Sequence, residues 1–383
     1  MTQKKIAVLH LLPSPYRLPL FERLLADQEY DVRLFFSGRQ AANRPTWSLS
    51  VLPEDNRVLR LPEIAFPGIR EGSDAVRINL GLSKIFKWKP DLVLICGPNE
   101  PTTILAAFLC AVRGIPYAIL AEVSASTNRS LRRRLYLPLM SFLVKRASWL
   151  GPASESCARF FEETGGTRRS MTILPCVPDY QKLVSIRREL ASNREALKQK
   201  HGLKGRFVLL FVGRLVENKG VVDLLESMRG VAARSPKVTL AVVGYGPMAD
   251  DVKRYERMLG DSIRYFGLVD DSRLYELYSI ADAHIMPSWS EPYGVVCAEA
   301  LSFGVPSIIT TTSGCRDLII DGVNGYMIPP NSPKDIEETV MKIVSNPDIQ
   351  SSMRSNAEST MRNLTMDHLY QSLKQVIASA LSD

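Results

Sequence analysis

Short apolar runs alternate with longer amphipathic segments along the whole chain. In residues 1–178 the apolar runs predict six β-strands, at Ile6–Leu12, Val32–Phe36, Leu92–Cys96, Tyr117–Leu120, Trp149–Pro152 and Met171–Leu174. The segments between them predict helices at Pro19–Gln28, Ala75–Trp88, Thr102–Arg113, Leu131–Ala147 and Glu155–Thr164. Because strands that alternate with helices form β-α-β units, the pattern predicts an α/β fold with a parallel sheet.

The same alternation returns after residue 200 and predicts a second sheet. Its six strands are expected at Phe207–Val212, Val238–Val243, Ile263–Phe266, Ala283–Met286, Ser307–Thr310 and Gly325–Ile328. Its helices are expected at Gly220–Ala233, Met248–Leu259, Asp271–Ser279, Val295–Ser302 and Pro333–Val344. The chain is therefore predicted to hold two α/β domains of similar construction.

Proline residues mark the boundary between the two domains. The segment Pro175-Cys176-Val177-Pro178 interrupts regular structure, so we predict one domain over residues 1–178 and a second over 179–363. A charged helix, Arg187–Lys200, is expected near the start of the second domain. An amphipathic helix over 364–383 ends the sequence, and we expect it to pack back towards the first domain.

Composition is that of a globular protein, and the charge is unevenly distributed. The 383 residues are 45% hydrophobic and 23% charged, which excludes disorder, collagen-like repeats and a small disulfide scaffold. The net charge is +8, and residues 1–178 alone hold 24 lysines and arginines against 15 acids. This asymmetry predicts an anionic partner for the first domain, either a phospholipid surface, a phosphorylated acceptor or nucleic acid. A basic surface without a partner is the alternative.

One segment, residues 129–146, concentrates this positive charge. Its cations alternate with apolar residues and include Arg132, Arg133, Arg134, Lys145 and Arg146. Two interpretations stay open: an amphipathic segment on anionic lipid, and a domain helix with a buried centre and solvated ends. Nucleic acid is disfavoured, since no basic array interleaved with aromatic residues is present.

Two further features bear on the compartment. No apolar run reaches the ~20 residues that a membrane-spanning helix needs. The six cysteines are at least 14 positions apart, lack the spacing of a metal site and mostly lie in apolar surroundings. We therefore expect free thiols, no metal and a cytoplasmic protein, with peripheral attachment to the inner face of the membrane as an open alternative.

Two cations follow a predicted strand end at residues 213–220. Arg214 offers a planar fork for phosphate oxygens and Lys219 a compact point charge. Gly213 permits the backbone to approach a ligand closely. This arrangement is suited to stabilising a departing diphosphate, and a solvated basic loop is the alternative.

A second turn, at residues 288–299, brings two glutamates to the start of a helix. The helix begins with unpaired amides that suit an anion, at Gly294, Val295 and Val296. Glu291 precedes the helix and Glu299 lies about two turns into it. We expect one carboxylate to meet a sugar hydroxyl and the other a ribose. Glu299 lies among apolar residues and needs a partner there, which favours a functional role over a structural one.

The pattern Gly244-x-Gly246-x-x-Ala249 is similar to a dinucleotide-binding fingerprint, with Asp270 downstream. However, it follows the second strand of its domain rather than the first, and Pro247 occupies the entry to the helix. A tight turn that borders a nucleotide is the preferred interpretation. No nicotinamide or other cofactor is expected.

Together these motifs resemble the retaining nucleotide-sugar glycosyltransferases of family four, the group 1 glycosyl transferases with the GT-B fold. The likeness covers about residues 185–345 and continues through Val243–Pro247, Gly304-Val305-Pro306 and Asp321–Gly325. It implies two Rossmann-like domains that face a central cleft. It also implies transfer of a sugar from a nucleoside diphosphate with retention of configuration, without a metal.

The resemblance assigns roles to residues of the second domain. Arg214 and Lys219 would hold the donor diphosphate, Glu291 the donor sugar and Glu299 the ribose. Further donor contacts are implied at Gly213, Phe266, Leu268, Gly294, Val295 and Val296. Arg214, Lys219 and Glu291 form the expected catalytic set there.

The first domain matches the family only in outline. Members often have two glycines after the first strand, where this chain has Pro13–Arg17, and we take Tyr16 and Arg17 as candidate acceptor contacts. Many members also have a histidine near the end of the fourth strand unit, where Leu120–Ser124 has none. Glu122 is our candidate for that role. An acceptor contact and a structural carboxylate are the alternatives for it.

The sequence thus predicts a glycosyltransferase that uses a UDP- or GDP-sugar and a glycan, lipid-linked or small-molecule acceptor. Bacterial polysaccharide, lipopolysaccharide or glycolipid synthesis is the expected setting for such an enzyme. Two alternatives remain. One is another GT-B enzyme, either a sugar-nucleotide epimerase or a phosphorylase, and the other is a non-catalytic nucleotide-sugar-binding subunit.

Overall fold

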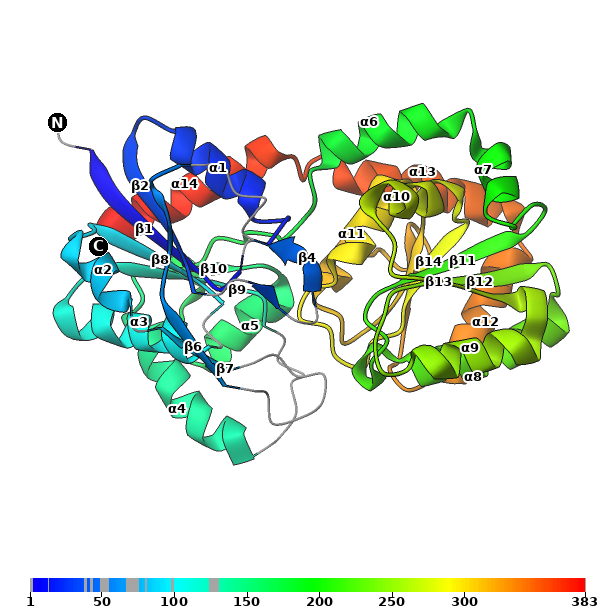
Figure 1. Ribbon diagram of the computed structural model, residues 1–383, viewed down its shortest axis with the longest axis horizontal. Helices are drawn as coiled ribbons and strands as arrows, with labels where there is room; N and C mark the ends of the chain where they lie inside the picture. The colour runs from blue at the N-terminus through cyan, green and yellow to red at the C-terminus, as the bar shows by residue number, and fades with distance from the viewer. Residues whose placement is uncertain are drawn as a thin grey trace. The chain divides into compact units, whose positions relative to one another are not determined.

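The computed structural model of the chain consists of two α/β units (Figure 1). It describes residues 3–12, 14–37, 40–41, 44–48, 55–66, 76–79, 81–97, 100–123 and 131–382. The first unit contains Met1–Cys176 together with Met366–Asp383, and the second contains Val177–Thr365. Each unit is built on a six-stranded sheet in which all neighbouring strands are parallel.

The sheet of the first unit has the strand order β10-β9-β8-β1-β2-β5. Its strands are β1 (Lys4–His10), β2 (Tyr30–Phe36), β5 (Val58–Arg60), β8 (Leu92–Cys96), β9 (Tyr117–Ala121) and β10 (Trp149–Pro152). The helices between them are α1 (Leu18–Ala26), α2 (Leu82–Lys87), α3 (Pro101–Arg113), α4 (Leu131–Arg146) and α5 (Glu155–Glu163). Two small antiparallel pairs join β3 (Gln40–Ala41) to β4 (Arg44–Ser48) and β6 (Glu63–Phe66) to β7 (Val76–Asn79).

Two predictions for the first unit are wrong. The segment Met171–Leu174 is not a strand, since Met171 makes only an isolated bridge to Leu150. The sixth strand is β5, a three-residue segment that pairs with the free edge of β2. The helix expected over Ala75–Trp88 begins only at Leu82, because Val76–Asn79 form β7 and Gly81 precedes the helix.

Helices cover both faces of this sheet. Side chains of α2, α3, α4 and α5 pack with the strands in one apolar cluster. On the other face lie α1 and the last helix, α14 (Met366–Ser382), which contacts α1 and strands β8, β9 and β10 (Figure 1). Lys374 of α14 lies 3.3 Å from Asp27, and Tyr370 donates a hydrogen bond to the same carboxylate. The end of the chain thus completes the first unit.

The second unit has the strand order β13-β12-β11-β14-β15-β16. Its strands are β11 (Phe207–Val212), β12 (Val238–Val243), β13 (Ile263–Gly267), β14 (Ala283–Met286), β15 (Ser307–Thr310) and β16 (Gly325–Ile328). Its helices are α6 (Tyr180–Ala191), α7 (Arg194–Lys200), α8 (Val221–Arg234), α9 (Ala249–Leu259), α10 (Asp271–Ile280), α11 (Val295–Ser302), α12 (Pro333–Val344) and α13 (Pro347–Met361). The single charged helix predicted over Arg187–Lys200 is in fact two helices with a break at Ser192 and Asn193, and α13 was not predicted.

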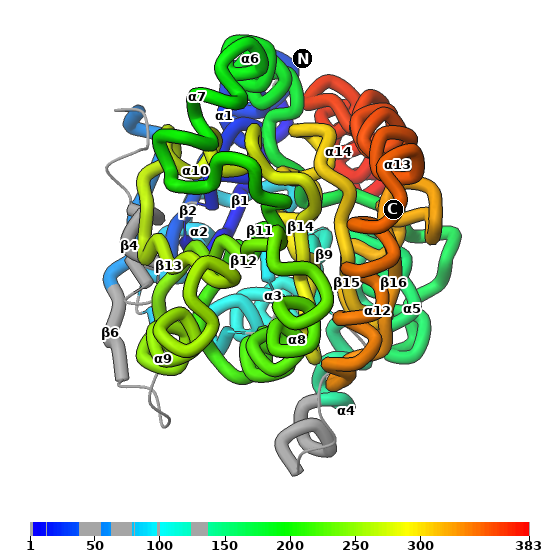
Figure 2. Tube along the Cα trace, turned by 90° about the vertical axis from the view of Figure 1, so that its right-hand side faces the viewer, coloured from blue at the N-terminus to red at the C-terminus, as the bar shows by residue number. Residues whose placement is uncertain are grey.

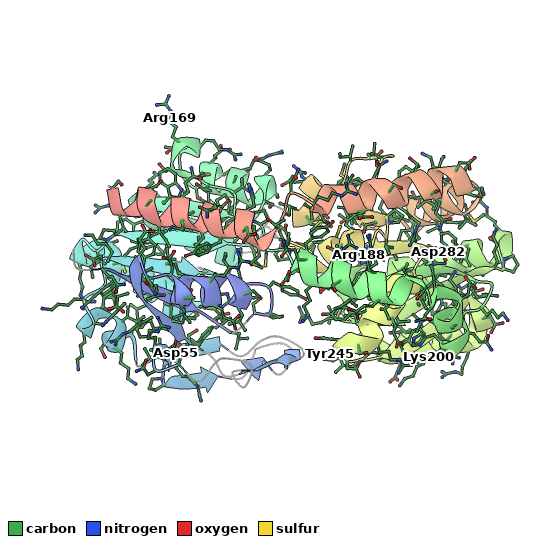
Figure 3. All side chains as sticks on the ribbon, turned by 90° about the horizontal axis from the view of Figure 1, so that it is seen from above. Asp55, Arg169, Arg188, Lys200, Tyr245 and Asp282 are labelled. Atoms are coloured by element: carbon green, nitrogen blue, oxygen red, sulfur yellow. The ribbon has the colours of Figure 1, made fainter. Side chains whose placement is uncertain are left out.

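Figure 2 shows the helix layers of the second unit, with α8, α9 and α12 on one side of the sheet and α6, α7 and α10 on the other. Asp282, the residue before β14, links α7 to the sheet through ion pairs and a hydrogen bond (Figure 3). Its carboxylate accepts from Arg194 at 2.8 Å, from Lys198 at 3.0 Å and from the Val208 amide at 2.8 Å. An acid in so enclosed a position is tolerated because every one of these partners offsets its desolvation.

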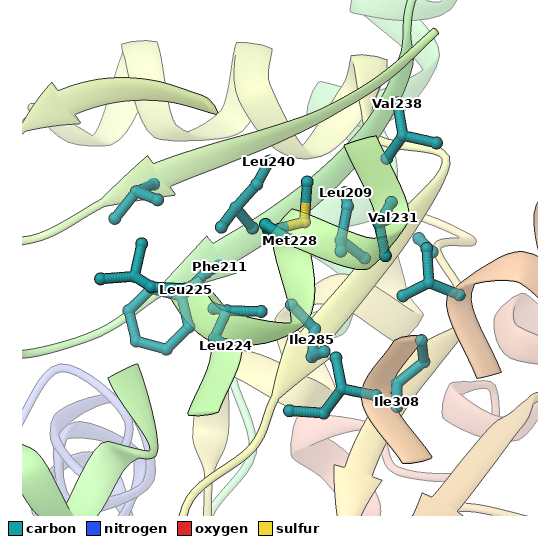
Figure 4. Packing of buried hydrophobic residues seen from close by; sticks show 14 of the residues in the cluster. Leu209, Phe211, Leu224, Leu225, Met228, Val231, Val238, Leu240, Ile285 and Ile308 are labelled. Atoms are coloured by element: carbon teal, nitrogen blue, oxygen red, sulfur yellow. The ribbon is translucent and has the colours of Figure 1, made fainter. Parts of the chain in front are cut away.

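Apolar side chains on both faces of the second sheet form its core. One cluster joins α8 and α12 to the strands, with Leu224, Met228 and Leu240 at 0–1% exposure (Figure 4). A second cluster on the opposite face includes Leu210, Tyr278 and Phe303. Strands buried on both faces are continuous apolar runs, which is why the sequence predicts them well. Since all the strands are parallel, the loops that follow β11, β12, β13 and β14 lie along the same edge of the sheet.

Candidate functional site

The loop after β11, which carries the two cations, is packed closely against the loop after β12. The Leu215 amide donates to the Tyr245 carbonyl at 2.8 Å. Gly244 and Gly246 have positive φ angles of 145° and 152°, and a Cβ atom on Gly244 would lie 1.8 Å from the Gly213 carbonyl oxygen. The two glycines therefore permit this close approach. Loop packing accounts for the Gly-x-Gly pattern without a dinucleotide.

Gly213 itself has a different environment. Its amide donates to the Val243 carbonyl at 3.0 Å, which continues the strand pairing by one residue. A Cβ atom at this position would meet nothing nearer than the Phe211 ring at 3.5 Å. A Cβ atom at Gly213 would thus make an ordinary van der Waals contact, so packing within the protein does not require a glycine here.

The loop after β14, which carries Glu291, packs against the loop after β11, which carries Arg214 and Lys219. The Trp289 amide donates to the Asn218 carbonyl at 2.9 Å. Gly220 has a positive φ of 68°, and a Cβ atom there would lie 2.1 Å from the Pro287 carbonyl oxygen. These contacts fix the two loops relative to each other before any ligand binds.

Lys219 and Glu291 form an ion pair between Nζ and Oε2, although 72 positions separate them in the sequence. Their side chains are 18% and 11% exposed, so solvent screens the pair only partly. The backbone of Glu291 is held from the other side, where the Gly314 amide donates to its carbonyl at 2.9 Å. The structure thus brings together two residues of the expected catalytic set.

Arg214 lies half-buried at the start of the same loop. Among the residues that the structure describes, no acid or carbonyl contacts its guanidinium. An arginine in this state can donate up to five hydrogen bonds to an added ligand, in the planar geometry that suits phosphate. Arg214 and Lys219 are therefore two cations on one loop, of which one is engaged and one is available.

Helix α11 begins at this edge of the sheet with a glycine and two valine amides. Gly294 precedes it with a φ of 96°, and a Cβ atom there would lie 2.7 Å from Met286 Cε. No side chain caps the helix, and the amides of its first turn, at Val295 and Val296, have no partner within an α-helix. Together with the positive end of the helix dipole, these amides suit an anion.

Glu299 is buried in α11 and has the partner that its apolar surroundings demand. The hydroxyl of Tyr278, on α10, donates to Glu299 Oε2 at 2.8 Å. The same hydroxyl lies 3.4 Å from the Val296 carbonyl oxygen. The carboxylate is therefore held in a defined orientation, about one turn rather than two from the helix start at Val295. The sequence motifs did not identify Tyr278.

Phe266 and Leu268 flank the end of β13. The Gly244 amide donates to the Gly267 carbonyl at 2.9 Å, which places this turn beside the β12 loop. The Arg273 guanidinium lies over the Phe266 ring, 5.3 Å from the ring centroid. The His201 and Phe266 rings form an edge-to-face pair with their centroids 5.9 Å apart. Leu268 is 54% exposed. Of the two, Leu268 presents the freer apolar surface.

In the first unit, Glu122 and Arg17 form a second polar group at the carboxyl end of β9. Arg17 Nη2 lies 3.4 Å from Glu122 Oε1 and donates to the Leu174 carbonyl at 3.2 Å. The Arg17 side chain is 4% exposed, while that of Glu122 is 39% exposed. Arg17 is thus a buried support, and Glu122 is the member that solvent reaches. Tyr16 lies beside them, just before α1.

His10 belongs to the same group, since the charges of Glu122 and Arg17 both act on its ring. It is the last residue of β1, so it reaches the edge where Glu122 lies. Burial lowers the pKa of His10 to about 4. The negative charge of Glu122 acts to raise this pKa, and the positive charge of Arg17 acts to lower it. The Leu12 amide donates to His10 Nδ1 at 3.3 Å, which leaves the proton of the neutral ring on Nε2. The predicted strand Ile6–Leu12 has His10 in its interior, so the sequence alone does not identify this residue.

Within the described ranges, no three His, Cys, Asp or Glu side chains gather in a way that would hold a metal ion. In the same part of the chain, each helix is too short or too polar to cross a bilayer. All six cysteines are buried and free.

Comparison with known proteins gives matches to sugar-transferring enzymes. The family model of the glycosyl transferases group 1 matches residues 193–360. The glycogen synthase of Mycobacterium tuberculosis is 26% identical over 320 residues, which cover 80% of this chain and 73% of that protein. The α-D-kanosaminyltransferase of Streptomyces kanamyceticus is 26% identical over 168 residues, 43% of this chain and 44% of that protein.

Among solved structures, Anabaena Alr3699/HepE in complex with UDP and glucose superposes with a TM-score of 0.76. The superposition covers 98% of this chain and all of that one, at 17% sequence identity. At that identity the likeness shows the fold alone. It confirms the predicted fold class, which is GT-B with two Rossmann-like domains.

Proposed function

We propose that this GT-B protein is a retaining glycosyltransferase with a nucleoside diphosphate sugar as donor, because residues 193–360 match the family model of the glycosyl transferases group 1. The observation that carries the proposal is the Lys219–Glu291 ion pair, which joins the loop after β11, where Arg214 also lies, to the loop after β14. The two cations suit the diphosphate of an activated sugar, and the acid beside them suits the hydroxyls of the sugar.

In this proposal the diphosphate binds between Arg214, Lys219 and the first amides of α11. The bond between the anomeric carbon and the β-phosphate oxygen breaks, and negative charge develops on that oxygen. Fixed cations and helix amides stabilise this charge without rearranging. Removing one such donor typically costs about 10²–10³ in rate.

Glu291 accepts hydrogen bonds from the donor sugar, and Glu299 accepts from the ribose. The Gly314 amide holds the backbone of Glu291, and Tyr278 holds the carboxylate of Glu299. Both acids are therefore set before the donor arrives, which limits the entropy that ordering them would cost. Phe266 and Leu268 border the base, with Leu268 as the exposed apolar contact.

Retention requires the acceptor hydroxyl to attack the face that the diphosphate leaves. The new bond joins the acceptor oxygen to the anomeric carbon, and the hydroxyl proton passes to the departing phosphate oxygen. Charge neutralisation by Arg214, Lys219 and the α11 dipole supports a reaction without metal or cofactor, and we propose that none is required.

The acceptor is proposed to bind to the first unit. Glu122 is the exposed carboxylate at the carboxyl end of β9 and takes the position where many relatives have a histidine. Arg17 acts as its positioning residue, with Tyr16 beside it. A hydroxylated acceptor fits a carboxylate of this kind, and we propose a glycan or lipid-linked sugar in polysaccharide, lipopolysaccharide or glycolipid synthesis. The glycogen synthase relative supports the glycan class.

The experiment is a thermal-shift panel of UDP, GDP and ADP and their sugars, followed by product analysis. A ligand that binds only the folded state at 100 times its Kd adds about 2.7 kcal/mol to the free energy of unfolding. We expect one base to raise the Tm of the wild type, and Lys219→Ala to lose that shift. NMR of the product should show the anomeric configuration of the donor.

Three results would contradict the proposal. Epimerised donor without transfer would indicate an epimerase, and a product that depends on free phosphate would indicate a phosphorylase. Binding without turnover in the presence of glycan and lipid-linked acceptors would indicate a non-catalytic nucleotide-sugar-binding subunit.

A further inference from the structure

The outward faces of α3 and α4 in the first unit are apolar. Five large side chains there are between 36% and 65% exposed: Leu105, Phe108 and Val112 on α3, and Leu139 and Phe142 on α4. The Phe108 and Phe142 rings lie 6.2 Å apart, centroid to centroid, so the two helices share one continuous surface. We call these five residues the α3–α4 patch.

Core packing does not account for the patch, because both helices already have a buried apolar face. On α3 the residues Ala106, Ala107 and Cys110 are fully buried, and on α4 the residues Met140 and Leu143 are. An ordinary surface helix has a polar face opposite its buried face. In α3 the exposed positions are instead apolar up to Val112, and only Arg113 at the end is charged. The outer face of α3 therefore has the composition of an interface.

The charged residues within the two helices have one sign, and the acid Glu100 lies one residue before α3. Neither α3 nor α4 contains an Asp or a Glu, while the two helices together contain Arg113, Arg132, Arg133, Arg134, Lys145 and Arg146. Lys145 and Arg146 are exposed one turn after Phe142, and the Arg146 guanidinium lies 5.5 Å from the Phe142 ring centroid. Exposed aromatic and aliphatic side chains on helices whose charged residues are all cations are typical of segments that lie in the headgroup region of anionic membranes.

Elsewhere the described surface of the molecule differs. In the second unit the exposed large apolar residues are spread over α8, α9 and two loops, at Val222, Met258, Leu268, Ile320 and Val323. Such scattered side chains are ordinary on soluble proteins. On the other face of the first sheet, α1 and α14 carry the acids Glu22 and Asp367 (Figure 1). Apolar exposure and unmixed positive charge thus coincide at α3 and α4.

We propose that the α3–α4 patch is a docking surface for an anionic phospholipid bilayer. The five apolar side chains enter the interface between headgroups and acyl chains, and the cations at the helix ends contact lipid phosphates. Of the two interpretations of the basic segment 129–146, the proposal favours the one in which the segment lies on anionic lipid. It lies in the first unit, on other elements than the donor residues, and does not depend on the proposed transfer chemistry.

The test is flotation of the full-length protein with two kinds of vesicle. One is phosphatidylcholine alone, and the other is phosphatidylcholine mixed with phosphatidylglycerol. We expect binding to the mixed vesicles, weakening as salt is raised, and little binding to phosphatidylcholine. Arg113→Gln/Lys145→Gln/Arg146→Gln should weaken binding by about fivefold per cation removed.

The apolar contribution needs its own variants. Phe108→Gln/Phe142→Gln should weaken binding by roughly tenfold per ring, while Phe108→Trp/Phe142→Trp should retain it. Met258→Gln, at an exposed apolar position on α9, is the matched control and should bind like the wild type. All the variants replace exposed side chains, so their Tm and their response to nucleoside diphosphates should stay unchanged.

Two outcomes would overturn the proposal. One is equal binding of the wild type and the Phe108→Gln/Phe142→Gln variant to the mixed vesicles, or no binding by either. The other is a homodimer in solution that dissociates in this variant without vesicle binding by the wild type, which would make the patch an interface between two copies. Neither outcome depends on sugar transfer, so the proposed function is judged separately.

Discussion

The hydroxyl of Tyr278 donates a 2.8 Å hydrogen bond to Glu299 Oε2, and it joins two helices that flank the carboxyl edge of the second sheet. A buried carboxylate is costly unless its charge is satisfied. Tyr278 lowers that cost and also fixes which way the carboxylate points. If Glu299 holds the ribose of the donor, Tyr278 acts on donor binding through Glu299 and is a positioning residue.

Tyr278→Phe should therefore weaken donor binding more than it slows transfer. The variant leaves Glu299 buried without this donor, which costs about 1–3 kcal/mol. We expect the KM for the donor to rise by about tenfold and the kcat to change little, because Glu299 is remote from the bond that breaks. Steady-state kinetics with varied donor measures the split. Tyr275→Phe, one turn earlier on α10, is the control and should keep the wild-type KM, and a loss confined to kcat would contradict the role.

Removing Lys219 should lower kcat, which Tyr278→Phe leaves almost unchanged, in addition to weakening donor binding. Lys219→Ala takes away a cation that stabilises the departing diphosphate, so kcat should fall by about 10²–10³. Glu291→Gln should also reduce transfer, since the amide is a weaker acceptor for sugar hydroxyls than the carboxylate. Lys253→Ala removes a lysine of α9 that pairs only at the surface, with Asp250 at 3.1 Å, and should retain full activity. Folded Lys219→Ala protein with wild-type turnover would remove the catalytic assignment.

Local sequence was sufficient for most of the sheet strands and for the separate motifs. Val238–Val243 is apolar at every position except Thr239 because both faces of β12 are buried, and its limits are predicted to the residue. The strand Val58–Arg60 was missed because its three residues are ordered by pairing with β2, a contact that no local pattern reveals. The same reason applies to α13, whose largely polar sequence forms a helix against α11 and α12.

The contacts within the candidate site depend even more on tertiary structure. Lys219 and Glu291 are each recognisable from their own motif, but their ion pair depends on how the loops after β11 and β14 pack. Tyr278 and Tyr275 occur three positions apart in one helix, and nothing in the local sequence distinguishes the one that meets Glu299. For His10 the missing information was its place at the end of a central strand, since the sequence fixes such an end only to within a residue or two.

Asp282 should contribute strongly to stability and only indirectly to activity. Burial opposes its ionisation, but Lys198 and Arg194 outweigh this effect and hold the pKa of Asp282 below its ordinary value. Asp282→Ala leaves the buried Lys198 without this carboxylate and should lower the free energy of unfolding by about 3–5 kcal/mol, measured by urea denaturation. Asp250→Ala, at an exposed ion pair on α9, should change it by less than about 1 kcal/mol. Similar midpoints for both variants would show that the Asp282 cluster is not needed for the fold.

The pH dependence of the Asp282 cluster follows from the sign of its shift. A carboxyl whose pKa is lowered by folding stabilises the native state above its unfolded pKa of about 3.9. This stability is lost as the pH falls through the lower pKa of the folded state. At neutral pH the free energy of unfolding of Asp282→Asn should therefore lie below that of the wild type by the full amount. As the pH falls through the pKa of the folded wild type, the difference between the two proteins should become smaller.

His284 should make the protein less stable in mild acid. The ring is completely buried in β14, Nδ1 lies 3.1 Å from Ser307 Oγ, and burial lowers the pKa of His284 from 6.5 to about 3. Below pH 6.5 the unfolded chain therefore binds a proton at this position that the folded chain does not, so the free energy of unfolding falls as the pH drops. The contribution of one such group is at most about 1.4 kcal/mol per pH unit. His284→Asn, which keeps a partner for Ser307, should reduce the slope of stability against pH between 6.5 and about 4, the pKa of His10. Urea denaturation at a series of pH values measures this slope. The control variant, His368→Asn at an exposed position of α14, should have the wild-type slope. An unchanged slope in His284→Asn would show that the His284 imidazole is protonated in the folded protein.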